Sequence, residues 1–196
     1  MTAMALPADT VPTNGPFTVD DLEAMPEDGR RYELIDGMLY VSPAPNLDHQ
    51  EVAVVLTIAL RQARPKDLQV VIAPFEWRSS DDTALQPDVL VARRADLFAV
   101  EDRKYLLKPP LLAVEVQSPS TRRYDRLTKL SVYQDEGVGS YWLIDPSPHD
   151  PSVTVLELKG DRYAEVARLA GDERLTVERP FQVELCPADL VAELQG

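Results

Sequence analysis

The chain has 196 residues, of which 44% are hydrophobic, a size and composition that suit one globular domain with its own core. The only cysteine, Cys186, excludes a disulfide within the chain, and no apolar run reaches the roughly 20 residues of a membrane-spanning helix. Because the N-terminus also lacks the basic and apolar segments of a signal peptide, we expect a cytoplasmic protein without a membrane partner.

A formal net charge of −13 repels phosphate groups at long range, but the charges are unevenly distributed. Residues 1–60 carry ten acids and two bases, whereas residues 91–130 carry nine bases and five acids. The basic stretch is either a docking face or an ordinary solvated segment of an acidic protein, and charge alone leaves both alternatives open.

Hydrophobic periodicity and turn residues divide the chain into a flexible arm over 1–16 and one domain over 17–196. In chain order the predicted elements are a helix over 18–25, a hairpin over 31–41, a helix over 48–64, strands over 70–77, 87–92 and 111–117, a helix over 118–136, a strand over 140–145, a hairpin over 153–167, a strand over 181–185 and a helix over 187–194.

Local signals support the first of these elements. The Asp36-Gly37 pair between two apolar segments is typical of a hairpin turn. Asp48, with Glu51 three residues later, resembles a capping box at the start of the long helix, which ends before Pro65. Apolar residues wrap most of this helix, so we expect it to be buried against a sheet.

The order of elements is helix, three strands, helix and strand, with hairpins added at both ends. This order predicts an α/β (α+β) domain built on a mixed sheet.

Two acidic residues stand in strands that are otherwise apolar. Asp88 opens one strand, and Glu115 lies inside another, on the same face as Gln117. Such carboxylates are costly to bury unless they are paired or bind a metal, and on neighbouring strands they would lie roughly 5 Å apart, close enough to share Mg²⁺. The alternative is a buried ion pair between Glu115 and a base of the following helix.

Longer blocks accompany these two carboxylates. They are Phe17-Thr-Val-Asp-Asp-Leu, Tyr32-Glu-Leu-Ile-Asp-Gly, the segment from Glu115 to Lys129, and Tyr141-Trp-Leu-Ile-Asp145. Together they resemble the Uma-two endonuclease family of the PD-(D/E)xK, restriction-endonuclease-like superfamily, and the resemblance covers nearly the whole chain.

The resemblance implies a core of helix, three-stranded meander, helix and strand, and a metal-dependent endonuclease that hydrolyses phosphodiester bonds, with DNA as the expected substrate. It also implies that Asp88, Glu115 and the backbone carbonyl of Val116 bind Mg²⁺ or Mn²⁺, which activates water and neutralises charge on the phosphate.

One position departs from the superfamily pattern, because Gln117 stands where the usual catalytic lysine lies. An amide orients water or phosphate but supplies no positive charge. A base of the following helix is the natural substitute, and Lys129 shares a helix ridge with Asp125 and Tyr133. The alternative for Lys129 is a surface ion pair with Asp125.

Further candidates carry weaker signals. We expect the arginines at the start of this helix, Arg122, Arg123 and Arg126, to contact nucleic acid. His49 opens the long helix and either contacts phosphate or caps the helix, and Glu33 is a possible further metal carboxylate.

Two functional hypotheses remain open at this level. The first is an active endonuclease, and the second is an inactive nucleic-acid- or protein-binding module that keeps the nuclease fold. The acidic net charge and Gln117 favour the module, whereas Asp88 and Glu115 favour the enzyme. Strands in the added hairpins, together with the resemblance, are compatible with a homodimer.

Overall fold

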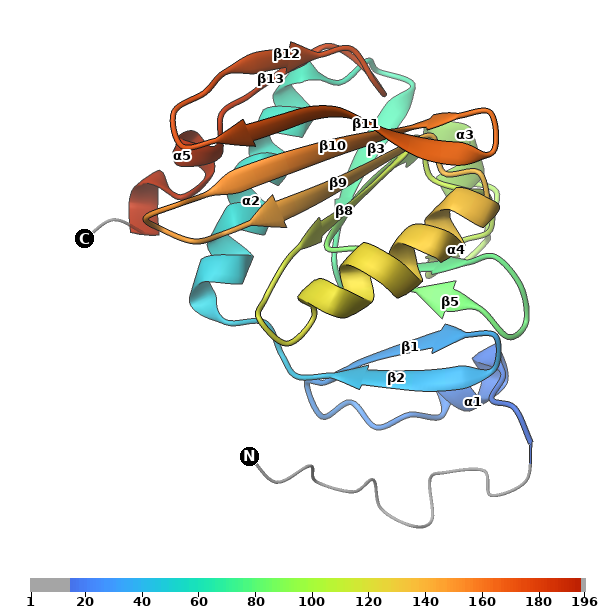
Figure 1. The fold of residues 1–196 in the computed structure, drawn as a ribbon. Helices are drawn as coiled ribbons and strands as arrows, with labels where there is room; N and C mark the ends of the chain where they lie inside the picture. The colour runs from blue at the N-terminus through green and yellow to red at the C-terminus, as the bar shows by residue number, and fades with distance from the viewer. Residues whose placement is uncertain (1–14, 195–196) are drawn as a thin grey trace.

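The computed structural model describes residues 15–194 (Figure 1). The predicted arm over 1–16 lies outside the described residues apart from Gly15 and Pro16. Within residues 15–194, no helix is long and apolar enough to cross a membrane.

The larger of the two main sheets has six strands in the spatial order β11–β10–β9–β8–β6–β3. Its strands are β3 (Leu68–Ile72), β6 (Val89–Arg93), β8 (Leu112–Val116), β9 (Ser140–Asp145), β10 (Ser152–Lys159) and β11 (Arg162–Ala170). Strands β3, β6 and β8 form an antiparallel meander, and β9 runs parallel to β8 after a helical crossover. The predicted mixed sheet is therefore confirmed.

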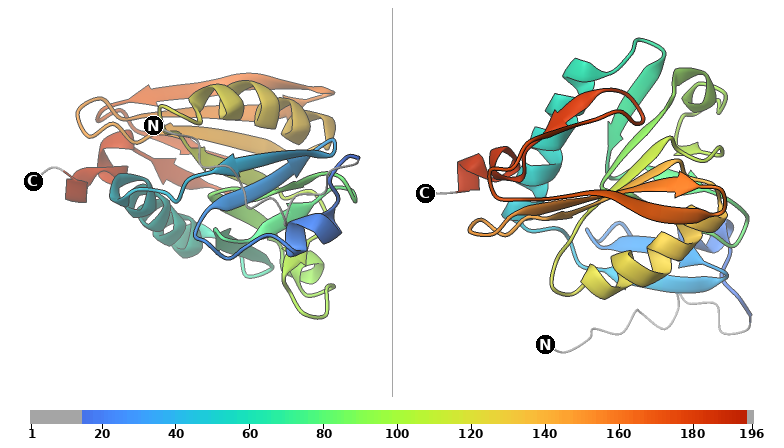
Figure 2. Two further views of the ribbon diagram at one scale, coloured as in Figure 1. Left: turned by 90° about the horizontal axis from the view of Figure 1, so that it is seen from below. Right: turned by 45° about the horizontal axis from the view of Figure 1, so that its top comes forward.

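Helices cover both faces of this sheet (Figure 2). Helix α2 (Leu47–Ala63) packs on the face that carries Leu112, Val114 and Val116 of β8. The crossover helix packs on the other face, where Tyr133 belongs to the same apolar cluster as Ala113. The predicted core of helix, meander, helix and strand is confirmed by this arrangement.

The C-terminal elements complete the α2 side of the sheet, because their apolar residues join the same core cluster. They are the hairpin β12 (Leu175–Val177) and β13 (Val183–Leu185), helix α5 (Pro187–Leu190) and the short 3₁₀ helix η2 (Ala192–Leu194). Strand β12 was not predicted, since only its partner strand carries a clear apolar pattern.

A second sheet of five short strands lies beside the first, in the order β2–β1–β5–β4–β7. Its strands are β1 (Arg31–Ile35), β2 (Met38–Ser42), β4 (Glu76–Arg78), β5 (Ala84–Leu85) and β7 (Tyr105–Leu106). Two short helices accompany it, α1 (Val19–Glu23) and α3 (Arg94–Leu97). The predicted strand over 70–77 is thus divided between the two sheets, because Pro74 interrupts it.

Alternation along β1 decides what the second sheet contributes to the site. Tyr32 and Leu34 pack against Leu22 of α1 in a small apolar cluster. Arg31 and Glu33 point to the opposite face of the strand, toward the edge of the six-stranded sheet. The predicted hairpin over 31–41 therefore brings charged groups to that edge.

The start and the burial of α2 differ from the prediction. Asn46 is the N-cap, and its side chain accepts the backbone N–H of His49 at 3.0 Å, so the predicted capping box at Asp48 is wrong. The helix also buries one side only, since Val54 and Ile58 are 43% and 51% exposed. It packs against the six-stranded sheet and the C-terminal elements and leaves its outer side exposed.

The predicted helix over 118–136 is not a regular α-helix. Residues Tyr124–Lys129 form a π-helical segment (η1), followed by α4 (Leu130–Asp135). The wider turn accompanies the burial of Asp125 and Lys129, each 2% exposed, against the charged edge of the sheet. Such π-helical turns occur often at functional sites.

Candidate active site

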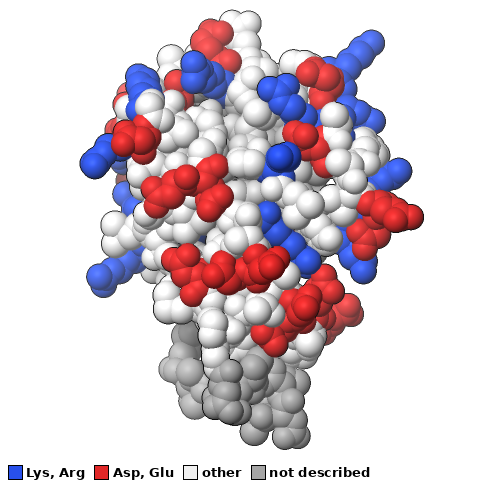
Figure 3. Space-filling view, turned by 90° about the vertical axis from the view of Figure 1, so that its right-hand side faces the viewer, with Lys and Arg blue, Asp and Glu red and all other residues white. Residues whose placement is uncertain are grey.

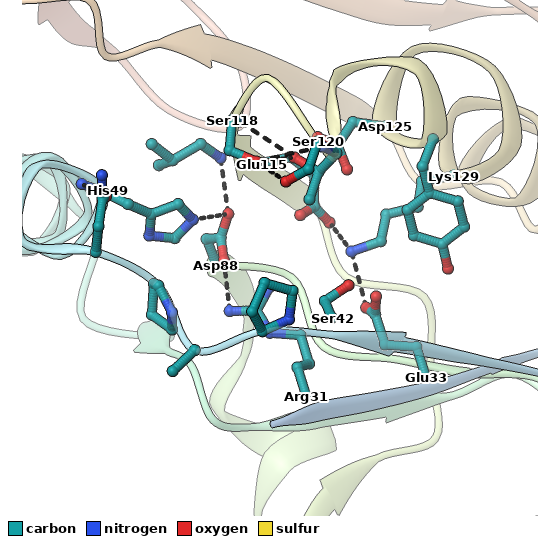
Figure 4. Close-up of a pocket in the computed structure, with 17 residues that line it drawn as sticks. Arg31, Glu33, Ser42, His49, Asp88, Glu115, Ser118, Ser120, Asp125 and Lys129 are labelled. Carbon is teal, nitrogen blue, oxygen red and sulfur yellow. Dashed lines mark hydrogen bonds and ion pairs between the residues drawn. The ribbon is translucent and has the colours of Figure 1, made fainter. Parts of the chain in front are cut away.

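A cavity of about 210 Å³ lies where the end of β8, the start of β6, the β1–β2 hairpin and the crossover helix meet (Figure 4). Its charged lining consists of Arg31, Glu33, His49, Asp88, Glu115, Asp125 and Lys129. The loop after β2 and the hydroxyls of Ser118, Ser120 and Thr121 form the rest of the rim.

The sheet register places the two predicted carboxylates side by side. Val89 pairs with Val114 in the antiparallel ladder between β6 and β8, so one further step sets Asp88 opposite Glu115. Both side chains are 2% exposed. The sequence-based expectation of neighbouring buried carboxylates therefore agrees with the structure.

Asp88 is held by two hydrogen bonds and one ion pair. Its Oδ2 accepts the backbone N–H of Val116 at 2.7 Å and faces His49 Nε2 at 3.0 Å, while Oδ1 lies 2.7 Å from Arg31 Nη2. Burial by itself raises the pKa of Asp88, but the His49 hydrogen bond and the Arg31 charge outweigh it and lower the pKa to about 2. This carboxylate is ionised in the folded protein.

Glu115 has a different set of partners. Its Oε1 accepts from Lys129 Nζ at 3.0 Å and from the Tyr133 hydroxyl at 2.7 Å. Burial, followed by nearby carboxylates, raises the pKa of Glu115 well above its usual range, although the Lys129 charge opposes the shift. Ionised Glu115 is therefore held against a large desolvation cost.

Lys129 links two elements through its ammonium group. Its Nζ lies 2.8 Å from Glu33 Oε1 in addition to the contact with Glu115. Burial favours the neutral amine, but the charges of Glu115 and Glu33 outweigh burial and raise the pKa of Lys129. Lys129 does not form the alternative surface ion pair with Asp125, because it is buried and pairs with two glutamates.

The cavity carries more negative than positive charge. Four carboxylates, those of Glu33, Asp88, Glu115 and Asp125, face two permanent cations, Arg31 and Lys129. Within residues 15–194, Asp125 Oδ2 is buried without a hydrogen-bond partner. Burial raises the pKa of Asp125 to about 6, against the opposing charge of Lys129.

This donor set fits a hard divalent cation, because carboxylate oxygens are the ligands that Mg²⁺ and Mn²⁺ prefer and the charge imbalance favours added positive charge. The arrangement is nevertheless ion-paired as it stands. Among the described residues, no three His, Cys, Asp or Glu side chains are grouped as ligands of one ion. Metal binding at Asp88 and Glu115 therefore stays a prediction.

The structure gathers six of the predicted site residues around the cavity. These are Glu33, His49, Asp88, Glu115, Val116 and Lys129. The other four, Gln117, Arg122, Arg123 and Arg126, are not part of the cavity lining. The first group contains the predicted metal ligands, the predicted catalytic Lys129 and the two weaker candidates, and the second contains Gln117 and the predicted nucleic-acid contacts.

Gln117 forms a small network behind the cavity. Its Oε1 accepts from Arg126 Nε at 3.2 Å and from Nη2 at 3.0 Å. Its Nε2 is buried and has no hydrogen-bond partner in the part of the chain that the structure describes. Gln117 thus brings a guanidinium next to the position that the superfamily lysine occupies.

The two outer arginines are more exposed. Arg122 is paired with Asp145 at 2.6 Å and its side chain is 46% exposed. Arg123 lies beside Ser120 and Tyr124 at a shallow surface hollow.

Acidic and basic side chains alternate on the face shown in Figure 3, with acids gathered across its lower part and no continuous basic band among the residues described there.

Two residues that line the cavity, Arg31 and Asp125, were not predicted from the sequence to do so. Arg31 directly precedes Tyr32 in an ordinary alternating strand, so its residue pattern resembles that of a surface arginine. Its contact with Asp88 depends on how the hairpin docks onto the larger sheet. The spacing of Asp125 and Lys129 predicts that both lie on one helix ridge and that Lys129 reaches the site, but it does not predict that Asp125 is buried there as well.

The fold and the paired carboxylates at one sheet edge define an α/β protein with a nuclease-like arrangement. A family model named Uma2 and described as "Putative restriction endonuclease" matches residues 19–191. The chain therefore belongs to this family, which confirms the resemblance drawn from its sequence. No protein with a curated description matches the chain.

A solved structure supports the fold assignment. The crystal structure described as "a putative nuclease belonging to DUF820" from Anabaena variabilis ATCC 29413 superposes with a TM-score of 0.69. The two sequences are 21% identical, and the match covers 91% of this chain and 99% of the other. At this level of identity the likeness shows the shared fold.

Proposed function

We propose that this protein is a metal-dependent endonuclease that hydrolyses phosphodiester bonds in DNA. The observation that carries the proposal is the placement of Asp88 and Glu115, two buried carboxylates on adjacent strands at the wall of one cavity. Burying two such groups is costly, and a fold retains them where their charge is used. Membership of the family described as "Putative restriction endonuclease" supports the same reaction class.

Asp88 and Glu115 would hold Mg²⁺ or Mn²⁺, with the Val116 carbonyl as the further ligand that the family resemblance supplies. A bound divalent ion there lowers the pKa of water and neutralises charge on the phosphate. His49 orients Asp88 through the contact at 3.0 Å, and the Val116 N–H fixes the same carboxylate from the sheet side. Both donors keep Asp88 ionised and ready to bind a cation.

Lys129 would supply positive charge beside the phosphate. Its ammonium is fixed by Glu33 as well as Glu115, so it stays in place when the Glu115 carboxylate has another partner. Gln117 holds Arg126 nearby through two hydrogen bonds and places a second cation behind the same edge. These two bases replace the charge that the superfamily lysine provides.

The DNA strand would reach the cavity past the start of the crossover helix. Arg122 and Arg123 lie on this side, and their phosphate contacts would guide the strand toward the hydroxyls of Ser118 and Ser120. Arg122 is partly neutralised by Asp145. We therefore expect modest DNA affinity that falls steeply with salt.

Nicking of a supercoiled plasmid in the presence of Mn²⁺ tests the proposal directly. Wild-type protein should convert the plasmid to open circles, and the same preparation with EDTA should not. The Asp88→Asn variant serves as the matched control for a contaminating nuclease. Mn²⁺-dependent nicking that is equal in wild type and Asp88→Asn would contradict the proposal.

The inactive binding module is the second candidate. It is favoured by the ion-paired state of both carboxylates, by the acidic net charge and by Gln117 in the usual lysine position. Calorimetric titration with Mn²⁺ separates the two functions. Binding that Asp88→Asn abolishes supports the enzyme, whereas DNA binding without any Mn²⁺ binding supports the module.

We also propose a homodimer that works in the cytoplasm. Leu47, Val54 and Ile58 expose apolar surface along the outer side of α2, which suits contact with a second copy. A mass corresponding to one chain in light scattering at high protein concentration would exclude the dimer.

A further inference from the structure

Arg31 makes the contact that distinguishes this site from a plain carboxylate pair. Its Nη2 lies 2.7 Å from Asp88 Oδ1, and the side chain is 16% exposed. It enters from β1, outside the sheet that carries Asp88 and Glu115. The close-up shows its guanidinium directed at Asp88 from the hairpin side, across from His49 (Figure 4).

Arg31 also borders two hollows, the cavity of about 210 Å³ and a second hollow of about 470 Å³. Arg31, His49 and Asp88 line both. Arg30, Gln50 and Gln86 add polar groups to the second hollow, and the rest of its wall is small or apolar, with Gly29, Ala44, Pro45, Ala53, Val54, Ile72, Ala73 and Pro74.

We propose that Arg31 is an internal counter-ion of Asp88, which competes with a divalent cation for this carboxylate and is freed by the cation to contact the phosphate of the substrate. The inference rests on the proposed function, since it assumes that Asp88 is a metal ligand.

Charge and geometry favour competition over cooperation. A buried carboxylate without a cation is strongly unfavourable, and Arg31 supplies that cation in the ion-free protein. A divalent ion bound to the same carboxylate would stand close to the guanidinium, and the two positive groups repel each other in a poorly solvated cavity. The ion pair with Arg31 must therefore weaken when the cation binds.

A freed guanidinium is well suited to bind the phosphate of the substrate. Arginine is permanently charged, and its planar donors match the oxygens of a phosphate in bidentate fashion. Arg31 already lies at the wall that the two hollows share, next to the proposed metal ligands. Metal binding and phosphate binding would in this way be coupled through one side chain.

The neighbouring residue offers a matched control. Arg30 is one position away in the same segment, but its guanidinium pairs with Asp28 and not with Asp88. Arg30→Met and Arg31→Met remove the same group from adjacent positions. Only the second substitution removes the partner of Asp88.

Mn²⁺ titration of the full chain by calorimetry is the decisive measurement. Arg31→Met should bind Mn²⁺ about tenfold more tightly than wild type, the scale of one charge-assisted hydrogen bond, and Arg30→Met should bind like wild type. Arg31→Lys should show a smaller gain, because the charge remains but reaches Asp88 less well. If Arg31→Met does not fold, Arg31→Lys alone tests the inference. A Mn²⁺ affinity of that variant equal to or below that of wild type overturns it.

Two further readouts separate competition from a purely structural role. Without metal, Arg31→Met should melt below wild type, and Mn²⁺ should raise its melting temperature by more. With Ca²⁺ added to a duplex oligonucleotide, wild type should gain DNA affinity and Arg31→Met should not.

The failures are distinguishable. If wild type binds Mn²⁺ and Arg31→Met binds it equally or more weakly, Arg31 does not compete with the cation and the inference is disproved, while the proposed nuclease stands. If neither protein binds Mn²⁺, both the inference and the proposed metal dependence fall.

Discussion

The strands that carry the carboxylates and the hairpin that carries their partners differ in one instructive way. Asp88 directly precedes the apolar strand β6, and Glu115 interrupts the apolar strand β8, so the burial of both carboxylates is already unusual in the sequence. On β1, Arg31 and Glu33 alternate with Tyr32 and Leu34, as in any half-exposed strand. The unusual pattern at β6 and β8 therefore indicates the site from sequence alone. The ordinary strand β1 supplies the charges that stabilise it.

This difference divides the roles of the two regions. Asp88 and Glu115 belong to the sheet core, so their positions follow from the strand register. Arg31 and Glu33 reach Asp88 and Lys129 only because the smaller sheet docks at that edge. Changes on β6 or β8 should remove the chemistry, and changes in the partners should shift affinities and stability.

The largest effect is expected on the core strands. Asp88→Asn and Glu115→Gln should each reduce cleavage below detection, because each removes the charge of a proposed metal ligand at constant volume. A discontinuous plasmid assay with Mn²⁺ measures this. Normal cleavage by either variant would disprove the site assignment.

Asp88→Asn and Glu115→Gln should have opposite effects on the stability of the fold without metal. The pKa of Asp88 is lowered to about 2, so its ionised form stabilises the fold at neutral pH, and Asp88→Asn should cost about 2 kcal/mol. The pKa of Glu115 is raised, so Glu115→Gln removes a desolvation penalty and should leave the melting temperature equal or higher. Thermal unfolding without metal tests both signs.

Lys129 connects the two regions, and replacing it should have the second-largest effect on cleavage. Lys129→Met should lower the cleavage rate by about 100-fold, the scale of one lost electrostatic contact in the transition state. It should also destabilise the fold by about 3 kcal/mol, because Glu33 and Glu115 lose their buried cation. Single-turnover cleavage and urea unfolding measure the two effects.

Two companion variants resolve how Lys129 acts. Lys129→Arg should keep part of the activity, since the charge survives with altered reach. Glu33→Gln removes one partner and leaves the ammonium in contact with Glu115, so it should alter stability more than rate. Wild-type cleavage by Lys129→Met would instead point to Arg126.

The sequence predicts the parts of this site that depend on local pattern. The fold class follows from periodicity, and Asp88 and Glu115 follow from charge in apolar strands, whereas the meander follows from the family resemblance. Lys129 follows from helical spacing and from the family resemblance. Arg31 does not follow, because nothing in the residues around it indicates where the hairpin will dock.

The π-helical segment is a second feature beyond sequence reasoning. An extra residue per turn changes which side chains face inward, and that choice depends on the partners that Asp125 and Lys129 find in the tertiary fold. The cap of α2 is a smaller case, where Asn46 and Asp48 are both good caps and the structure selects Asn46.

Asp125 offers a pH test of the buried edge. Its pKa is about 6 in the folded protein and about 3.8 unfolded, so its contribution to stability is full below the unfolded pKa and is lost as pH rises through 6. The free energy of unfolding of wild type, relative to Asp125→Asn, should fall by about 2–3 kcal/mol between pH 4 and pH 7. A flat difference over this range would mean that Asp125 is solvated.

The smallest effect is expected on the outer face, where the arginines of the crossover helix are exposed. Arg122→Ala and Arg123→Ala should each reduce the slope of log affinity against log salt by roughly 0.9 if each contacts one phosphate. The loss in affinity should be modest, since Arg122 is shared with Asp145. Fluorescence anisotropy with a duplex oligonucleotide, over a series of salt concentrations, gives the slopes.

Arg168→Ala is the matched control for this last test. Arg168 lies on β11, its side chain is 52% exposed, and it pairs with Glu165 much as Arg122 pairs with Asp145. If DNA docks at the crossover helix, Arg168→Ala should leave the slope unchanged. Equal slopes in all three variants and wild type would move the docking face away from Arg122 and Arg123, without touching the assignment of Asp88 and Glu115, because phosphate contacts at the rim and metal ligation in the core are separate interactions.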